Sequence, residues 1–157
     1  MKIRWKTLII AIAIPLGVGA LSSFLTMGSM ESFSALEQPP LSPPGWLFPI
    51  VWTVLYTLMG IASYIVVEYG VDSAEKTEAL KAYAIQLLFN FGWTIIFFNL
   101  DLYYVAFAWL LVLLITIITT AVRFYKISKW AFYLLIPYIA WVAFAGYLNL
   151  GIAILNG

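Results

Sequence analysis

The stretch WLFPIVWTVLYTLMGIASYIVV, residues 46–67, decides the fold of this chain, because it contains no Asp, Glu, Lys, Arg or His. A helix needs about 20 predominantly apolar residues to cross the hydrocarbon core of a bilayer. This stretch meets that requirement, and four others in the chain do so as well. The five predicted spans are residues 7–27, 46–67, 82–99, 103–122 and 130–155.

The composition agrees with an integral membrane protein. Of the 157 residues, 64% are hydrophobic and 10% are charged, and the mean hydropathy is +1.01. Such a chain is too apolar for a soluble domain and long enough for one small bundle. Backbone groups in lipid must pair within the protein, and the chain has too few alternating strand patterns for a barrel. We therefore expect an all-α fold: one domain, residues 1–157, forming a bundle of five transmembrane helices.

The basic residues predict the orientation of the bundle, because they occur only before the first span and in alternate connections between the others. Segment 28–45, the turn at 100–102 and the C-terminal tail contain no Lys or Arg. By the positive-inside rule, the N-terminus is inside and the C-terminus outside. The basic N-terminus resembles a signal peptide, but the apolar run after it has the length of a full span, so we expect a retained helix. The basic residues are Lys2, Arg4, Lys6, Lys76, Lys81, Arg123, Lys126 and Lys129.

The residue types that the chain lacks exclude several classes of function. The chain has no Cys and no His, which removes disulfides, thiol nucleophiles and histidine chemistry, and we expect no metal site. A net charge of +1 gives no electrostatic case for binding nucleic acid. The spans offer no candidate for acid–base or nucleophilic catalysis, and the lack of an intramembrane carboxylate argues against proton-coupled transport.

The connections differ in character. Segment 28–45 contains four of the seven prolines, so we expect it to be stiff without being helical. It is either a spacer that ends at a helix with Pro43 in its first position, or a lid-like loop over the outer mouth of the bundle. The turn after the third span is short, and Asp101 is the predicted cap of the next helix, while Asp72 or Ser73 is a candidate cap in segment 71–81.

Three spans each have one face of aromatic and amide side chains at helical spacing. Amides are costly against lipid and must point inward, so the three faces together can enclose one pocket. The faces consist of Phe48, Trp52, Leu55, Tyr56 and Met59; of Tyr83, Gln86, Asn90, Trp93 and Phe97; and of Tyr138, Trp141, Ala145, Leu148 and Asn149.

Packing is the alternative interpretation of these residues. Aromatic and amide side chains inside membrane bundles often serve only as packing and hydrogen-bonding groups between helices. Trp5, Trp46, Trp109 and Trp130 fit that role, as helix-start anchors at the interface or as packing. Trp52, Trp93 and Trp141 instead lie well inside spans, on faces shared with an amide or a tyrosine, which favours ligand binding.

Three stretches resemble one known family. They are LEQPPLSPPGWLFPIVWTVLYTLMG at 36–60, YAIQLLFNFGWTIIFF at 83–98 and PYIAWVAFAGYLNLGIAILN at 137–156. They are similar, in order and spacing, to the first loop with the second helix, the third helix and the fifth helix of the translocator protein family. That family is also called the tryptophan-rich sensory protein, TspO/MBR or peripheral benzodiazepine receptor-like family. The resemblance covers essentially the whole chain.

The resemblance implies a cavity beneath the first loop that binds protoporphyrin IX or a related tetrapyrrole, together with isoquinoline carboxamide and benzodiazepine-type drugs. The porphyrin would be a ligand, with no cofactor required, in a sensory or regulatory protein of a bacterial cell membrane. The alternatives are passive transport of porphyrin-like or lipidic molecules, and light- and oxygen-dependent porphyrin degradation with Trp52 and Trp141 as catalytic residues. The predicted ligand-binding residues are Phe48, Trp52, Tyr56, Gln86, Asn90, Trp93, Phe97, Tyr138, Trp141, Ala145 and Leu148.

Two further expectations concern partners. Membrane lipids surround the chain, and the family often pairs, for which Ala13 and Gly17 offer a small-xxx-small spacing on the first span. The chain also departs from the family pattern, with Ser32 and Phe33 in place of Trp-Tyr and Gln38 in place of Lys. The first loop further contains Glu31 and Glu37 without a basic residue, so its charge would repel the propionates of a porphyrin.

Overall fold

The structure is a computed structural model that describes residues 2–157, all of them in helices or short connections without a strand. Five helices are long and apolar enough to cross a membrane, which confirms the predicted all-α bundle. The elements are α1 (Trp5–Thr26), the 3-10 turn η1 (Met27–Ser29), α2 (Met30–Ser34), α3 (Leu47–Tyr69), α4 (Ala74–Thr94), the π-helical turn η2 (Ile95–Asn99), α5 (Tyr103–Tyr125) and α6 (Lys129–Asn156).

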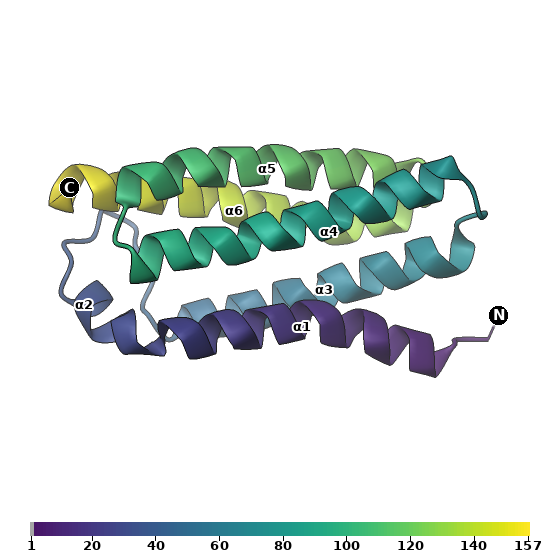
Figure 1. The fold of residues 1–157 in the computed structure, drawn as a ribbon, viewed down its shortest axis with the longest axis horizontal. Helices are drawn as coiled ribbons and strands as arrows, with labels where there is room; N and C mark the ends of the chain where they lie inside the picture. The colour runs from purple at the N-terminus through teal and green to yellow at the C-terminus, as the bar shows by residue number, and fades with distance from the viewer. Residues whose placement is uncertain (1) are drawn as a thin grey trace.

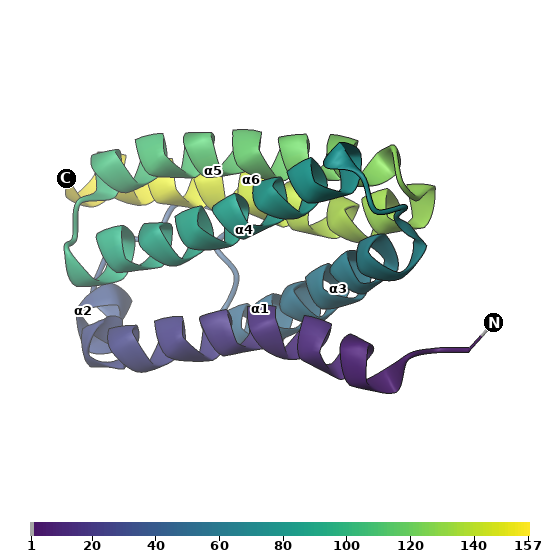
Figure 2. The same ribbon diagram turned by 45° about the vertical axis from the view of Figure 1, so that its right-hand side comes forward.

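The helices follow one another around the bundle in the order α1, α3, α6, α5, α4, and a lighter contact between α4 and α1 closes the ring. The two chain ends lie at opposite ends of the bundle (Figure 1). We call the end with the N-terminus and the α3–α4 and α5–α6 turns the basic end, because it holds all eight Lys and Arg residues. The other end, with α2 and the irregular segment 35–46, is the loop end (Figure 2).

Two glycines let α1 and α3 approach closely. A Cβ on Gly60 would lie 2.5 Å from the Cα of Ile12, and a Cβ on Gly19 would lie 2.5 Å from the ring of Tyr56. Small residues are the usual means by which membrane helices bring their backbones together. Gly17, by contrast, has nothing within 4 Å of its Cβ position, and with Ala13 it lies exposed on the outer face of α1, so the dimer stays a prediction.

Helix α4 begins at Ala74, well before the predicted start of the third span at residue 82. The hydroxyl of Ser73 caps it, accepting from the backbone N–H of Lys76 at 3.4 Å. The ammonium of Lys76 in turn donates to the carbonyl oxygen of Val67, near the end of α3. The candidate cap at Ser73 is thus confirmed. The predicted start was wrong because only the charge-free run was assigned to the span, whereas the helix begins earlier, with a polar, capped turn.

Segment 28–45 is partly helical, contrary to the prediction. The chain continues from α1 through η1 and α2, and α3 begins at Leu47, so Pro43 does not start it. The predicted cap by Asp101 is also wrong. Asp101 has a φ of 54°, and its carboxylate accepts a hydrogen bond from the Tyr103 hydroxyl at 3.4 Å. The N-cap position of α5 is Leu102, which has no side-chain cap.

Candidate functional site: an aromatic layer above a polar layer

Four rings in the loop-end half of the bundle form what we call the aromatic layer: Phe48, Trp52, Trp93 and Trp141. All four are only half-buried. Phe48 and Trp141 meet edge to face with ring centroids 5.7 Å apart, which joins α3 to α6. Trp52 packs on Tyr56, one turn further along α3, at 5.5 Å. The rings therefore keep accessible surface on helix faces that elsewhere form the core.

Beneath these rings lies a polar layer of Tyr56, Gln86, Asn90 and Tyr138, all buried. The Tyr56 hydroxyl donates to Asn90 Oδ1 at 2.9 Å, and Asn90 Nδ2 donates to the Tyr138 oxygen at 2.8 Å. The Tyr138 hydroxyl donates to Gln86 Oε1 at 2.6 Å, and Gln86 Nε2 lies 3.9 Å from the Met59 sulfur. These bonds tie α3, α4 and α6 together, so protein partners occupy both amides, as the packing interpretation expects.

Trp93 is held by a second chain of hydrogen bonds. Its indole N–H donates to Asn149 Oδ1 at 2.9 Å, and Asn149 Nδ2 donates to the Tyr103 carbonyl oxygen at 2.9 Å. Its ring stacks on Phe97 at 5.3 Å, inside the stretch where the helix changes to the π-helical turn η2. Such turns are rare and are often found at functional sites. The face of the Trp93 ring, and not its N–H, is the part left for a ligand.

Trp141 differs from Trp93, because its indole nitrogen is buried and has no hydrogen-bond partner among the described residues. A buried donor without an acceptor costs free energy unless a ligand supplies one. The ring also borders an open apolar groove of about 490 Å³ between α3 and α6, which we call the flank groove. Its lining consists of Ile50, Val51, Val54, Leu55, Pro137, Ala140, Trp141 and Phe144.

Sequence reasoning did not predict the flank groove, and only Trp141 of the predicted ligand-binding residues lines it. Its other residues are ordinary apolar side chains of two spans, and no spacing within one helix shows that two helices leave a gap between them. The remaining predicted residues, Phe97, Ala145 and Leu148, are buried in the loop-end half. Phe97 forms a small core there with Ala106 and Ile152.

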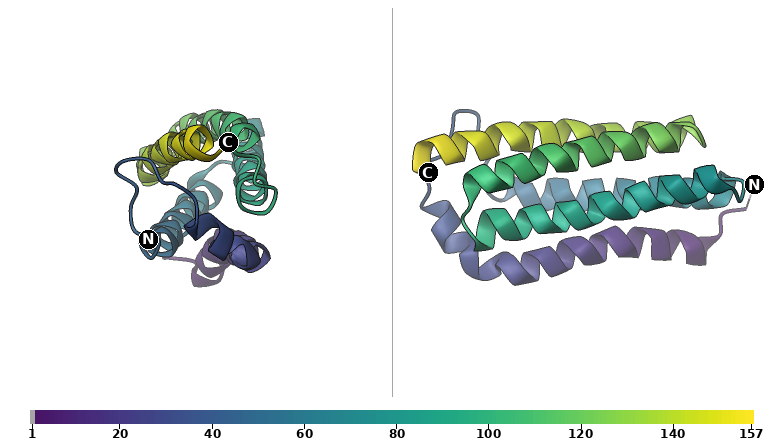
Figure 3. Two further views of the ribbon diagram at one scale, coloured as in Figure 1. Left: turned by 90° about the vertical axis from the view of Figure 1, so that its left-hand side faces the viewer. Right: turned by 45° about the horizontal axis from the view of Figure 1, so that its top comes forward.

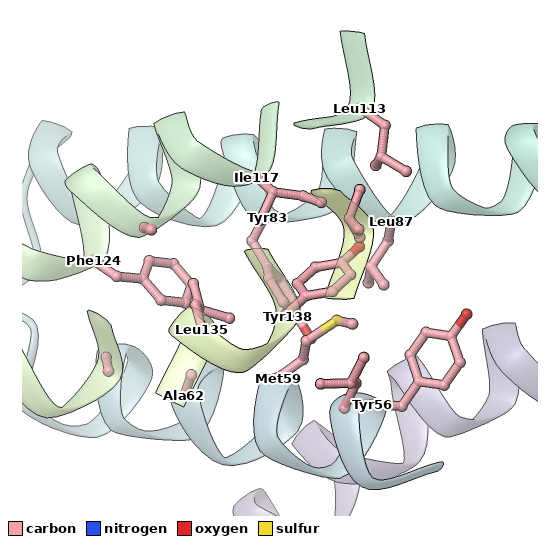
Figure 4. Packing of buried hydrophobic residues seen from close by; sticks show 14 of the residues in the cluster. Tyr56, Met59, Ala62, Tyr83, Leu87, Leu113, Ile117, Phe124, Leu135 and Tyr138 are labelled. Carbon is pink, nitrogen blue, oxygen red and sulfur yellow. The ribbon is translucent and has the colours of Figure 1, made fainter. Parts of the chain in front are cut away.

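The interior of the basic-end half, below the polar layer, is closely packed. Met59, Ala62 and Val66 of α3 are 0% exposed, and Phe124 and Leu135 pack against them from α5 and α6. Figure 4 shows Met59, Ala62, Phe124 and Leu135 converging between the helices. The interior of the basic-end half therefore leaves no accessible ring surface between these side chains, whereas the rings of the aromatic layer keep some in the loop-end half.

Segment 35–46 crosses the loop end and is fastened to α6 (Figure 3). Asn156 Nδ2 donates to the Glu37 carbonyl oxygen at 2.8 Å, while its Oδ1 accepts from the Glu37 N–H at 2.9 Å. The Tyr147 hydroxyl donates to the Pro40 carbonyl oxygen at 2.6 Å, and the Pro39 ring lies where a Cβ on Gly151 would be. The contacts of Tyr147, Gly151 and Asn156 were not predicted from the sequence, because each joins α6 to a segment far earlier in the chain.

The fold and site define a class of protein: a five-helix membrane bundle in which amides bond to phenols and to an indole across the interior. Within that class the chain belongs to the TspO/MBR family, whose model matches residues 11–155. The predicted resemblance is thereby confirmed.

Relatives match over most of their length. The chain is 38% identical over 151 residues to the tryptophan-rich protein TspO of Chlorobaculum tepidum, a match that covers 96% of each chain. It is 33% identical over 152 residues to the tryptophan-rich sensory protein of Cereibacter sphaeroides, covering 95% of this chain and 90% of that one. It is 39% identical over 122 residues to the translocator protein of Bos taurus, covering 74% and 70%.

Proposed function

We propose that this protein binds a flat tetrapyrrole, protoporphyrin IX or a close relative, on the aromatic layer and acts as a membrane sensor of that ligand. The observation that supports this most directly is the unpartnered indole N–H of Trp141 among half-buried rings above a closed polar layer. A macrocycle stacks on indole and phenyl faces and needs few polar contacts to orient it. Its ring nitrogens or carboxylates supply the acceptor that Trp141 lacks.

The flank groove gives this ligand a route from the membrane. Its walls are apolar, and it runs along α3 and α6 up to the ring of Trp141. A hydrophobic molecule dissolved in the bilayer reaches the aromatic layer through it without crossing the fastened segment 35–46. The smaller isoquinoline carboxamide and benzodiazepine-type compounds fit the same surface on the same grounds.

Titration of the purified protein with protoporphyrin IX in the dark tests this proposal. Trp141→Phe keeps a stacking ring and removes the N–H, so we expect affinity to fall by about two- to ten-fold, the value of one neutral hydrogen bond. Trp5→Phe is the matched control, because Trp5 is 64% exposed at the basic end. Unchanged affinity in Trp141→Phe, or equal losses in both variants, would contradict the proposed site.

The same samples under illumination separate a binder from an enzyme. The predicted spans contain no His, Cys or charged side chain, so porphyrin breakdown here needs light, oxygen and the redox activity of Trp52 and Trp141. We expect the double variant Trp52→Phe/Trp141→Phe to suppress any bleaching that exceeds that of free porphyrin in detergent. Bleaching at the rate of free porphyrin in the wild-type protein would exclude the enzymatic alternative.

A further inference from the structure

A second hollow, which we call the rim hollow, opens at the basic end, far from the aromatic layer. It measures about 460 Å³, within the range of small-molecule sites. Its walls are apolar side chains, including Leu8 and Ile12 of α1 and Ile61 and Ile65 of α3. Ser128 and Trp130, at the start of α6, complete its edge. The hollow is therefore apolar along its length and polar only where the bundle meets water.

Two cations border this polar edge. The ammonium of Lys129 lies 5.5 Å from the centroid of the Trp130 ring. The Arg4 backbone N–H donates to the hydroxyl of Tyr64, a residue that lines the hollow, at 2.9 Å. The Arg4 guanidinium is 70% exposed and lies 3.2 Å from the Glu68 carboxylate, which fixes it at the edge and leaves its other N–H groups available.

The remaining charges at the basic end differ between its two sides. Near the α3–α4 turn, Lys76 pairs with Asp72 at 3.1 Å and Lys81 with Glu78 at 3.5 Å. Lys129, beside the rim hollow, forms no ion pair within residues 2–157. Of the two cations beside the hollow, Arg4 thus has an acidic partner in Glu68, and the charge of Lys129 is left without one among these residues.

We propose that the rim hollow binds one anionic phospholipid from the adjacent leaflet. An acyl chain covers the apolar walls, and the headgroup phosphate contacts Lys129, Arg4 and the hydroxyl of Ser128. Ser128 is at the N-cap position of α6 and makes no side-chain cap bond there, and the first N–H groups of α6 add to the attraction for an anion. Basic pockets between transmembrane helices on the cytoplasmic side are a general means of holding such lipids.

Both parts of the hollow are needed to select this ligand. A free phosphate ion gains nothing from the apolar walls, and a zwitterionic lipid gains less from the cations because its own ammonium offsets them. Trp130, 63% exposed, has the amphipathic ring that membrane proteins place at the headgroup level. The site is independent of the aromatic layer, which lies in the opposite half of the bundle.

Native mass spectrometry of the purified protein with phosphatidylglycerol and phosphatidylcholine of identical chains tests this site. We expect the wild type to retain the anionic lipid preferentially. Lys129→Gln should weaken binding of phosphatidylglycerol by about five-fold and leave that of phosphatidylcholine unchanged, while Lys129→Arg should keep the preference. Lys81→Gln, which removes one charge from the same end outside the hollow, should change neither.

Three outcomes would overturn the proposal. Equal retention of the two lipids would remove the role of the cations. Equal losses of phosphatidylglycerol binding in Lys129→Gln and Lys81→Gln would show that the lipid is attracted to the charge of the whole basic end and does not occupy a defined site. Competition by inorganic phosphate as effective as that by phosphatidylglycerol would show a plain anion site. Ile65→Phe, which fills the apolar wall, should lower retention of both lipids, and a thermal melt checks that the variant folds.

Discussion

The two halves of this bundle are built from the same helices and pack in opposite ways. In the basic-end half, Met59 and Val66 of α3 and Leu135 of α6 are almost fully buried. In the loop-end half, Trp52 of α3, which meets Tyr138 of α6 edge to face, and Trp141 of α6 both remain half-buried. Flexible aliphatic side chains interdigitate to near-crystalline density, whereas rigid flat rings held by a few edge contacts leave surface uncovered.

The polar layer marks the boundary between the halves. Its tyrosines and amides bond to one another across three helices, so the boundary is fixed by directional contacts and not by lipid. The accessible ring surface of the loop-end half thus follows from a change in side-chain shape along the helices, on the other side of this boundary from the closely packed core.

The orientation of the two halves gives the prediction with the largest effect. A reporter fused after Gly157, at the loop end, should be active only outside the cytoplasm. One inserted at Val71, in the α3–α4 turn, should be active only inside, because this turn lies at the basic end. Activity assays in whole cells measure both. The reverse pattern would place the loop end and its aromatic layer on the cytoplasmic side.

Truncating a side chain to Ala should lower the free energy of unfolding by different amounts in the two halves. Leu135→Ala should lower the free energy of unfolding by about 2 kcal/mol or more, because it leaves a void in close packing. Phe48→Ala should cost less, since that ring is already half-exposed, but it should weaken porphyrin binding. Unfolding in denaturing detergent and porphyrin titration measure the two effects. Equal stability losses would show that the halves pack alike.

The polar layer predicts an intermediate effect. Asn90→Leu removes the bonds to Tyr56 and Tyr138, and the unfolding free energy should fall by about 1 kcal/mol, as is typical of interhelical amides. Gln38→Leu, at an exposed amide in segment 35–46, is the control and should have no effect. A loss of porphyrin affinity at unchanged stability would instead show that Asn90 contacts the ligand.

The fastening of segment 35–46 predicts a kinetic effect. Asn156→Ala removes both bonds to the backbone of Glu37, so the segment should open up to about ten-fold more often. Limited proteolysis should therefore become faster, whereas the rate of porphyrin exchange should stay unchanged, because the flank groove admits the ligand without crossing the segment. Ser34→Ala, which deletes only a local bond within α2, should leave both rates unchanged. Faster exchange in Asn156→Ala would show that the ligand passes beneath the segment and would contradict the route through the flank groove.

The smallest expected effect concerns charge at the loop end, where Glu31, Glu37 and Asp101 are exposed and no Lys or Arg occurs. Glu37→Gln should raise the affinity for protoporphyrin IX by less than about five-fold, because solvent screens an exposed charge. The dimethyl ester of the porphyrin, which lacks the carboxylates, is the control and should bind both proteins equally. A gain with the ester too would rule out the electrostatic explanation.

The sequence determined the number and type of the spans, because a bilayer requires about 20 apolar residues per helix. It also determined which faces point inward, because buried amides at helical spacing cannot lie against lipid. The periodicity of Tyr56, Asn90 and Tyr138 accordingly predicted three residues that the structure brings into direct hydrogen bonds. Helix ends were less predictable: Ser73 was one of two candidate caps, yet the span was started at residue 82 and not at Ala74, because the capped turn lies outside the apolar run.

Only the tertiary structure decided how those inward faces divide between packing and binding. Trp93 and Trp141 follow similar sequence patterns, yet Asn149 satisfies one indole and the other has no partner among residues 2–157. The flank groove, the rim hollow and the fastening by Asn156 also depend on where two distant segments meet. Periodicity within one helix specifies a direction, whereas the space left between helices depends on the shapes of side chains from all of them.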